Sequence, residues 1–209
     1  MRSTTAAPAL LVLALLVGVT GCSDHSTDNA DPTIAPATSS APTNGTPKPS
    51  STASPRESAS PFLADTSADD GGQGSGNGLG LTGVRVAHHP GFDRVVFDLG
   101  GTGTPGWRVE YTTRPRYDGS GEPVRLKGTV YLQVFLRGMG FPDDIGIAPY
   151  GDSTTRLPGT GTRGIAEIVP GGVFEGDQQA FIGLTGAKRP FRAFALANPA
   201  RVVVDVRDS

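Results

Sequence analysis

The chain has 209 residues and a composition rich in turn-forming residues, with 30 Gly, 18 Pro and only 36% hydrophobic residues. This composition disfavours long helices. The formal net charge of -2 excludes the strongly basic field of a general nucleic-acid binder, so no nucleic-acid partner is expected. One Cys and three His exclude an intramolecular disulfide and leave little material for a metal site. We therefore expect no metal and no cofactor.

Residues 1–21 have the pattern of a bacterial secretory signal peptide. Arg2 supplies a positive charge, and residues 9–19 form an apolar run too short to cross a bilayer as a mature helix. The run ends in Val19-Thr20-Gly21-Cys22, which resembles the lipobox of bacterial lipoproteins. The resemblance implies that Cys22 is acylated and anchors the protein to the extracytoplasmic face of the cell membrane. The alternative is an ordinary secretory signal with a chance Cys.

Residues 22–80 predict a lipidated, disordered linker rich in Ser, Thr, Pro and Gly. Between residues 23 and 80 the large apolar residues are Ile34, Phe62, Leu63 and Leu79, too few to form a core. The last part, residues 69–80, is especially rich in Gly. The linker is interpreted either as a tether that carries the folded part away from the membrane or as a spacer with no selected length.

Residues 81–209 predict an all-β domain, because short alternating apolar runs are separated by Gly, Pro and Asp. In residues 129–137, for example, Val130, Leu132, Val134 and Leu136 share one face of the expected strand. No window keeps a helical period, so we expect an antiparallel β-sandwich of two sheets, or a barrel. The expected strands are 84–88, 94–99, 107–112, 124–127, 129–137, 165–169, 180–184, 191–196 and 201–206.

Two of these strands repeat one another. Residues 94–98 read Arg-Val-Val-Phe-Asp and residues 201–205 read Arg-Val-Val-Val-Asp, so each strand places its Arg and Asp on one face. An Arg and an Asp four residues apart in a strand are separated by about 13 Å, so any ion pair must form between strands. One interpretation is a pair of structural salt bridges at equivalent edges of a pseudo-symmetric sandwich. The other gives Arg94, Asp98, Arg201 and Asp205 a role in ligand binding.

Several motifs suggest chemistry that their surroundings do not support. Residues 101–106 and 159–164 both fit G-x-G-x-x-G, but strand-like runs follow them where a phosphate site needs a helix, so both predict turns. Gly151-Asp152-Ser153 resembles the nucleophile block of a lipase family, yet no His follows His89 to act as base. His88 and His89 are adjacent and point to opposite faces of a strand, so they do not share a metal ion. We expect no catalytic and no metal-binding residues.

Aromatic and charged side chains leave weaker alternatives open. Trp107 and Tyr111 are residue types that stack on sugars, but with Val109 they alternate along one strand face and are more simply core residues. Basic residues between Arg108 and Lys127 suggest contact with anionic wall polymer or lipid headgroups. A carboxylate-based hydrolase is a third, weaker hypothesis. Its candidate carboxylates are Asp143, Asp144, Glu167, Glu175 and Asp177.

Residues 191–206 resemble the closing signature of AMIN and AMIN-like domains, which has a Phe-containing strand, the turn Asn198-Pro199, and then Arg, apolar residues and Asp. Residues 91–98, 105–111 and 174–176 are similar to other blocks of the AMIN-like domain of bacterial lipoproteins. The resemblance spans about residues 82–207. It implies a β-sandwich of two pseudo-symmetric sheets that acts as a non-catalytic module and targets proteins to the envelope, in part by binding peptidoglycan.

The sequence thus favours a lipid-anchored, non-enzymatic protein of the cell envelope that binds peptidoglycan or a related wall glycan. The alternative is a protein-interaction module that docks an envelope enzyme or secretion complex through an exposed strand edge. The expected partners are the membrane, through Cys22, and either the glycan or an envelope protein. The candidate binding residues are Arg94, Asp98, Trp107, Tyr111, Arg201 and Asp205.

Overall fold

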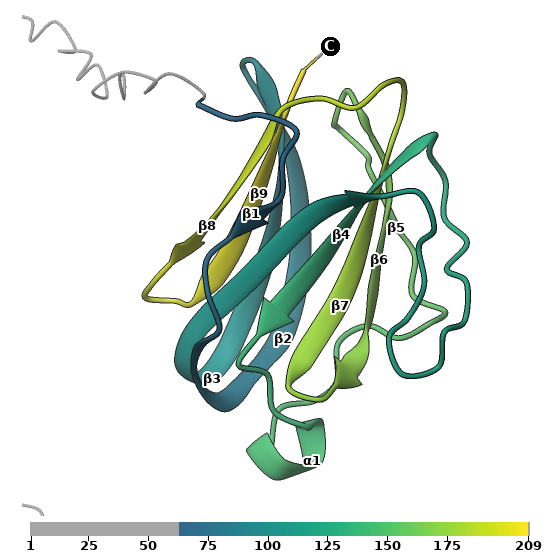
Figure 1. The fold of residues 1–209 in the computed structure, drawn as a ribbon. Helices are drawn as coiled ribbons and strands as arrows, with labels where there is room; N and C mark the ends of the chain where they lie inside the picture. The colour runs from purple at the N-terminus through teal and green to yellow at the C-terminus, as the bar shows by residue number, and fades with distance from the viewer. Residues whose placement is uncertain (1–62, 209) are drawn as a thin grey trace, which may run out of the picture. The chain divides into compact units, whose positions relative to one another are not determined.

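The computed structural model describes residues 63–208, which consist almost entirely of antiparallel strands (Figure 1). The elements are β1 (Asp69–Asp70), β2 (Gly74–His89), β3 (Phe92–Thr112), β4 (Val130–Arg137), α1 (Pro142–Ile145), β5 (Leu157–Pro158), β6 (Ile165–Phe174), β7 (Asp177–Leu184), β8 (Phe191–Leu196) and β9 (Arg201–Arg207). The predicted all-β class is confirmed. The signal peptide, Cys22 and most of the predicted linker lie outside the described residues.

The strands form two antiparallel sheets that share the long strand β3. Sheet A has the order β2-β3-β9-β8 and uses the N-terminal half of β3. Sheet B has the order β1-β3-β4-β7-β6-β5 and uses the C-terminal half. In Figure 1, β8 and β9 lie on the left, β4, β7 and β6 lie toward the right, and buried residues of both sheets pack into one core, so the two sheets are the layers of a sandwich. The predicted antiparallel sandwich of two sheets is confirmed.

The core lies between the two sheets and follows from the alternation of the strands. In β4, Leu132, Val134 and Leu136 are fully buried, whereas the residues between them are partly exposed, as their spacing predicts. A second, smaller apolar cluster forms outside sheet B, where Val124 packs with Val169 and Phe181. Val124 belongs to the loop between β3 and β4, so the prediction of a strand at residues 124–127 is wrong. The apolar residues of this loop cover the outer face of sheet B and do not form a strand.

Strand β3 crosses from one sheet to the other at its Gly-rich middle, residues 101–106. The sequence predicts two strands separated by a turn here, which is wrong, since pairing continues through this segment. Gly101 and Gly103 adopt positive φ angles of 91° and 132°, which allow a sharp bend within a continuous strand. A methyl group on Gly101 would overlap the carbonyl oxygen of Gly78 in β2. Two Gly-rich backbones therefore meet at this bend.

The folded part begins well before residue 81, so the predicted boundary between linker and domain is too late. The first half of β2 lies in the Gly-rich part of the predicted linker, and its Leu79 is fully buried in the core. Farther upstream, Asp65 accepts the N–H of Phe191 and the Asp69 carboxylate accepts the N–H of Ala193. Because β1 also pairs with β3, this segment joins the β8 edge of sheet A to the β3 edge of sheet B. Hydrogen bonds to neighbouring strands hold residues 65–80 in the fold, and amino-acid composition alone does not predict such pairing.

Candidate functional site

The repeated strands β3 and β9 are neighbours, and they bring their charged residues to the outer face of sheet A. Arg94 lies opposite Asp205, and Asp98 lies opposite Arg201. The strands occupy the two inner positions of sheet A, so the expectation of equivalent edges is wrong. In each strand the Arg and the Asp share one face, as predicted, and the pairing of β3 with β9 places all four residues on the same face of the sheet. By register and alternation, the outer face of sheet A consists of Arg85, Ala87, His89, Phe92, Arg94, Val96, Asp98, Arg192, Phe194, Leu196, Arg201, Val203, Asp205 and Arg207.

Asp205 is the centre of this face. Its side chain is 0% exposed, because Arg94 and Arg192 from the two flanking strands cover it. Arg94 donates Nε and Nη2 to the two carboxylate oxygens at 2.6 and 2.9 Å, and Arg192 donates Nε at 2.9 Å. A predicted cross-strand pair is thus confirmed for Arg94 and Asp205. Asp98, by contrast, accepts two hydrogen bonds from Arg85 of β2, at 2.6 and 2.7 Å.

Two aromatic rings flank the paired guanidinium groups. The guanidinium carbons of Arg94 and Arg192 lie 5.2 to 5.7 Å from the ring centroids of Phe92 and Phe194. His89 stacks on Phe92 with ring centroids 5.1 Å apart. These cation–π contacts fix the orientation of both Arg side chains. With five Arg against two Asp, the outer face of sheet A is a cationic surface with partly exposed aromatic rings.

The remaining predicted candidates, Trp107 and Tyr111, lie elsewhere. They pair with core residues of β4 and pack against the core, so the structure favours the alternative that makes them core residues. The hydroxyl of Tyr111 donates to the carbonyl oxygen of Arg189 at 2.7 Å and accepts the N–H of Arg189 at 2.9 Å. Burial raises the pKa of Tyr111. Gly71 lies directly against the Trp107 ring, with no room for a side chain.

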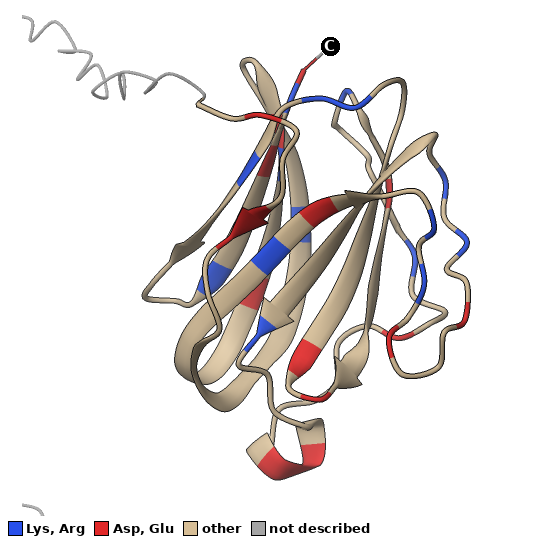
Figure 2. Ribbon diagram, viewed as in Figure 1, with Lys and Arg blue, Asp and Glu red and all other residues tan. Residues whose placement is uncertain are grey.

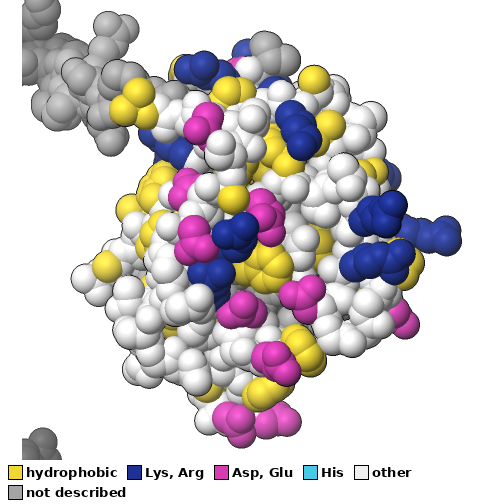
Figure 3. Space-filling view, in the orientation of Figure 1, with side chains coloured by type: hydrophobic (Ala, Val, Ile, Leu, Met, Phe, Trp, Pro, Cys, Tyr) yellow, Lys and Arg dark blue, Asp and Glu magenta, His cyan; other side chains and the backbone are white. Residues whose placement is uncertain are grey.

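The outer face of sheet B, which faces the viewer in Figure 3, has mixed charges. Asp70 accepts hydrogen bonds from Arg108 at 3.3 Å and Arg137 at 3.0 Å, and Arg108 also donates to Glu110 at 2.7 Å. The backbone N–H of Gly72, together with both Arg residues, lowers the pKa of Asp70. Acidic and basic side chains accordingly alternate across the middle of Figure 3. Unlike sheet A, this face presents balanced charge.

A basic groove lies beside it, in the loop between β3 and β4. It encloses about 420 Å³ and is lined by Thr113, Arg114, Pro115, Arg116, Pro123, Val124, Arg125, Leu126 and Tyr131. Figure 2 shows several basic residues along this loop. The predicted basic cluster is therefore divided: Arg108 joins the sheet B network, whereas Arg114, Arg116 and Arg125 line the groove. The groove is a second cationic surface, with one aromatic ring.

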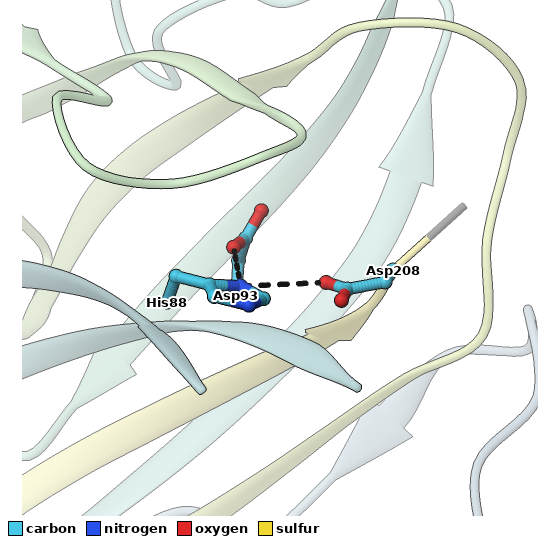
Figure 4. Close-up of side chains that lie close together, drawn as sticks. All are labelled: His88, Asp93 and Asp208. Atoms are coloured by element: carbon cyan, nitrogen blue, oxygen red, sulfur yellow. Dashed lines mark hydrogen bonds and ion pairs between the residues drawn. The ribbon is translucent and has the colours of Figure 1, made fainter. Parts of the chain in front are cut away.

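At one end of sheet A, the side chains of His88, Asp93 and Asp208 converge (Figure 4). Nδ1 of His88 lies 3.0 Å from Oδ1 of Asp93 and 3.6 Å from Oδ1 of Asp208. Asp93 is buried and also accepts the backbone N–H groups of Arg163 and Gly164. These amides belong to the Gly-rich segment 159–164, which forms a turn, as predicted. That turn binds an anionic group supplied by the chain itself.

The segment that contains Gly151-Asp152-Ser153 forms a turn, closed by a hydrogen bond from the N–H of Thr155 to the carbonyl oxygen of Asp152. Oδ1 of Asp152 accepts the N–H and hydroxyl groups of Thr154 and Thr155, which lowers the pKa of Asp152 to about 2. Neither described histidine hydrogen-bonds to Ser153, since His88 contacts Asp93 and His89 stacks on Phe92. The lipase-like motif has the role of a turn.

The fold and the site define a β-sandwich module with a cationic and aromatic outer face. A scan of family models matches residues 79–208 to the AMIN-like domain. The chain therefore belongs to the AMIN-like family, as its resemblance predicts. AMIN-like domains are associated with the cell envelope and peptidoglycan.

Searches of curated proteins and of solved structures found no match. Within residues 63–208, no helix has the length and apolar character needed to cross a membrane.

Proposed function

We propose that this protein is a lipid-anchored, non-catalytic module of the cell envelope that binds peptidoglycan or a related wall glycan. The outer face of sheet A is the binding surface. Family membership supports the association with the envelope and with peptidoglycan. The observation that carries the proposal is the convergence of five Arg side chains and two Phe rings on this one sheet face.

The chemistry of this face suits a wall glycan. Peptidoglycan presents carboxylates on its peptides beside sugar rings that have an apolar and a polar side. A guanidinium group binds carboxylates through paired hydrogen bonds, and an aromatic ring provides a flat apolar surface. On this face, Asp205 and the Phe rings hold Arg94 and Arg192 in place. A surface held in this way loses little conformational entropy when it binds.

The lipid anchor is proposed from the sequence alone, because Cys22 lies outside the described residues. Acylation of Cys22 with two chains provides the stable attachment that one chain does not. The protein is then held at the extracytoplasmic face of the membrane. We expect the variant Cys22→Ala to move from the membrane fraction to the soluble fraction of cells. Unchanged membrane partitioning would contradict the anchor.

A protein-docking role is the alternative. Along its last part, up to His89, β2 pairs only with β3 among the described residues, so its other edge has backbone groups open to an added strand. This role predicts a defined protein in cross-linked complexes and no affinity for the glycan. The proposed non-catalytic role predicts no clearing of wall polymer in zymography.

The experiment is co-sedimentation of the full chain, purified in detergent, with purified peptidoglycan at low and at high salt. We expect co-sedimentation that persists at high salt, because paired hydrogen bonds and aromatic contacts are screened less than dispersed charge. No co-sedimentation of a chain that circular dichroism shows to be folded would contradict glycan binding. Binding that disappears at high salt would indicate nonspecific attraction and also contradict it.

A further inference from the structure

We propose that His88, Asp93 and Asp208 form a binding site for one divalent transition-metal ion of the Zn²⁺ class. The site is independent of the proposed glycan-binding face. Its three donors come from the end of β2, the start of β3 and the residue that follows β9. One nitrogen and two oxygen donors are a ligand set that Zn²⁺ accepts.

The spacing of the donors suits a metal ion. Two ligands of a tetrahedral Zn²⁺ lie about 3.3 Å apart, given metal–ligand distances of about 2.0–2.1 Å. Nδ1 of His88 lies 3.0 Å from Asp93 Oδ1 and 3.6 Å from Asp208 Oδ1, which brackets that value. One donor atom from each of the three residues lies within 4.8 Å of the other two. Small movements of the side chains, chiefly of the two carboxylates toward one another, bring these three atoms onto one ion.

Hydrogen bonding alone does not satisfy the cluster. A proton on Nδ1 of His88 is donated to Asp93, and the 3.6 Å distance to Asp208 is too long for a second hydrogen bond. Oδ1 of Asp208 is then a buried carboxylate oxygen with no hydrogen-bond partner. With the proton on Nε2, the Nδ1 lone pair faces two carboxylates. A metal cation at this position binds Nδ1 of His88 and one carboxylate oxygen each of Asp93 and Asp208 at the same time.

Other contacts already orient both carboxylates. The backbone N–H groups of Arg163 and Gly164 bind the Asp93 carboxylate, with a shortest distance of 2.6 Å. The guanidinium group of Arg163 lies 3.3 Å from Oδ2 of Asp208, which leaves Oδ1 directed at His88. Such outer contacts fix the ligands of metal sites and are part of their affinity. Three protein ligands leave a fourth position for water or an external donor.

A metal ion at this position ties together two segments that are far apart in the sequence. It joins the β2–β3 hairpin to the end of β9, next to the turn at residues 159–164. Binding to the folded chain alone stabilises the fold by mass action. We therefore expect Zn²⁺ to raise the melting temperature of the protein.

The test is calorimetric titration of the metal-stripped full chain, in detergent, with Zn²⁺ alone. We expect one ion per chain, and the variant Asp208→Asn to weaken binding by at least about tenfold. Asp208 follows the last strand, so this substitution preserves the fold. The matched control is His89→Gln, which removes the neighbouring imidazole from the opposite face and is expected to bind Zn²⁺ like the parent. Equal Zn²⁺ binding by Asp208→Asn and the parent would overturn the proposal, as would no binding by the parent.

A second measurement identifies the coordination. Co²⁺ replaces Zn²⁺ in tetrahedral sites, so we expect visible absorption bands of tetrahedral Co²⁺ that Asp208→Asn loses and His89→Gln retains. Ca²⁺ and Mg²⁺ prefer six or more oxygen ligands and are not expected to compete. Displacement of Co²⁺ by equimolar Ca²⁺ would contradict assignment to the Zn²⁺ class.

Discussion

Arg94 binds both carboxylate oxygens of Asp205, although the two residues lie 111 positions apart and Asp205 is on the outer face of a sheet. Burial of this carboxylate results from the side chains that lie over it, chiefly the Arg94 and Arg192 guanidinium groups. A carboxylate between two guanidinium groups is paired more than once, so its charge is compensated despite the loss of water. The same contacts join β3, β9 and β8 and shape the proposed binding surface.

Replacement of Asp205 is expected to destabilise the fold severely. Asp205→Ala leaves two guanidinium groups side by side without their shared carboxylate, and removal of one partner from a buried ion pair costs about 3–5 kcal/mol. The measurement is the free energy of unfolding in urea. Asp98→Ala is the matched control, because Asp98 holds the equivalent place in the other repeat but pairs with the 61% exposed Arg85. Its expected cost is below about 1 kcal/mol. Similar costs at the two positions would contradict the structural role of Asp205.

The bend of β3 makes a prediction about its glycines. Gly101→Ala places a methyl group against the Gly78 carbonyl oxygen in addition to requiring a positive φ of 91°. Gly91→Ala is the control, since Gly91 has a φ of 93° but open space around it. The φ penalty is about 1–2 kcal/mol at either position, and the overlap adds about 1–3 kcal/mol at Gly101 alone. Urea denaturation of both variants measures the difference. Equal costs would show that the backbones do not approach so closely.

Removal of residues 63–80, which include the Gly-rich first half of β2, is expected to abolish cooperative folding. A chain that starts at residue 81 lacks β1, the first half of β2 and the fully buried Leu79, and it leaves the middle of β3 without its partner. A chain that starts at residue 63 keeps all these contacts. Circular dichroism during heating should show a sharp transition for the longer chain only. A sharp transition for both would place the start of the fold at residue 81 after all.

Asp177 gives the fold a defined pH dependence. Burial raises the pKa of Asp177 above the usual value for an Asp side chain, although Arg137 acts in the opposite direction. The folded state therefore binds this proton more tightly than the unfolded state, so the contribution of Asp177 to stability is present at low pH and is lost as pH rises through the folded pKa. We expect Asp177→Asn to gain stability near pH 7 and to show no gain near pH 3. Because the side chain is only partly buried, the gain is below about 0.5 kcal/mol. A loss of stability at neutral pH would contradict this.

The strands that follow a period of two could be predicted from the sequence. The bounds predicted for β8 agree with the structure at both ends, and the alternation in β4 identified its buried face. The Gly-rich strands could not be predicted, because β1 and the first half of β2 are held by backbone pairing and carry few apolar side chains. Residues 124–127 show the converse error, since apolar residues in a loop cover the outside of sheet B.

The candidate site was only partly predictable. The repeat of Arg and Asp identified Arg94 and Asp205, and it indicated that an ion pair had to form between strands. The partners Arg192, Phe92 and Phe194 depend on the register of three strands, although Arg192 and Phe194 do share a face by their spacing. Sequence reasoning also missed the cluster around His88. Its two carboxylates come from distant segments, and the adjacent His89 points away.

The most direct measurement compares the affinity of two double variants of the full chain for purified peptidoglycan. Arg201→Gln with Arg207→Gln removes two positive charges from the outer face of sheet A, whereas Arg114→Gln with Arg125→Gln removes two from the basic groove. We predict an affinity at least about tenfold weaker for the outer-face variant, from two charged hydrogen-bonding groups worth about 1.5–3 kcal/mol each, and little change for the groove variant. An unchanged affinity of the outer-face variant, with loss in the groove variant, would contradict the assignment of the binding face.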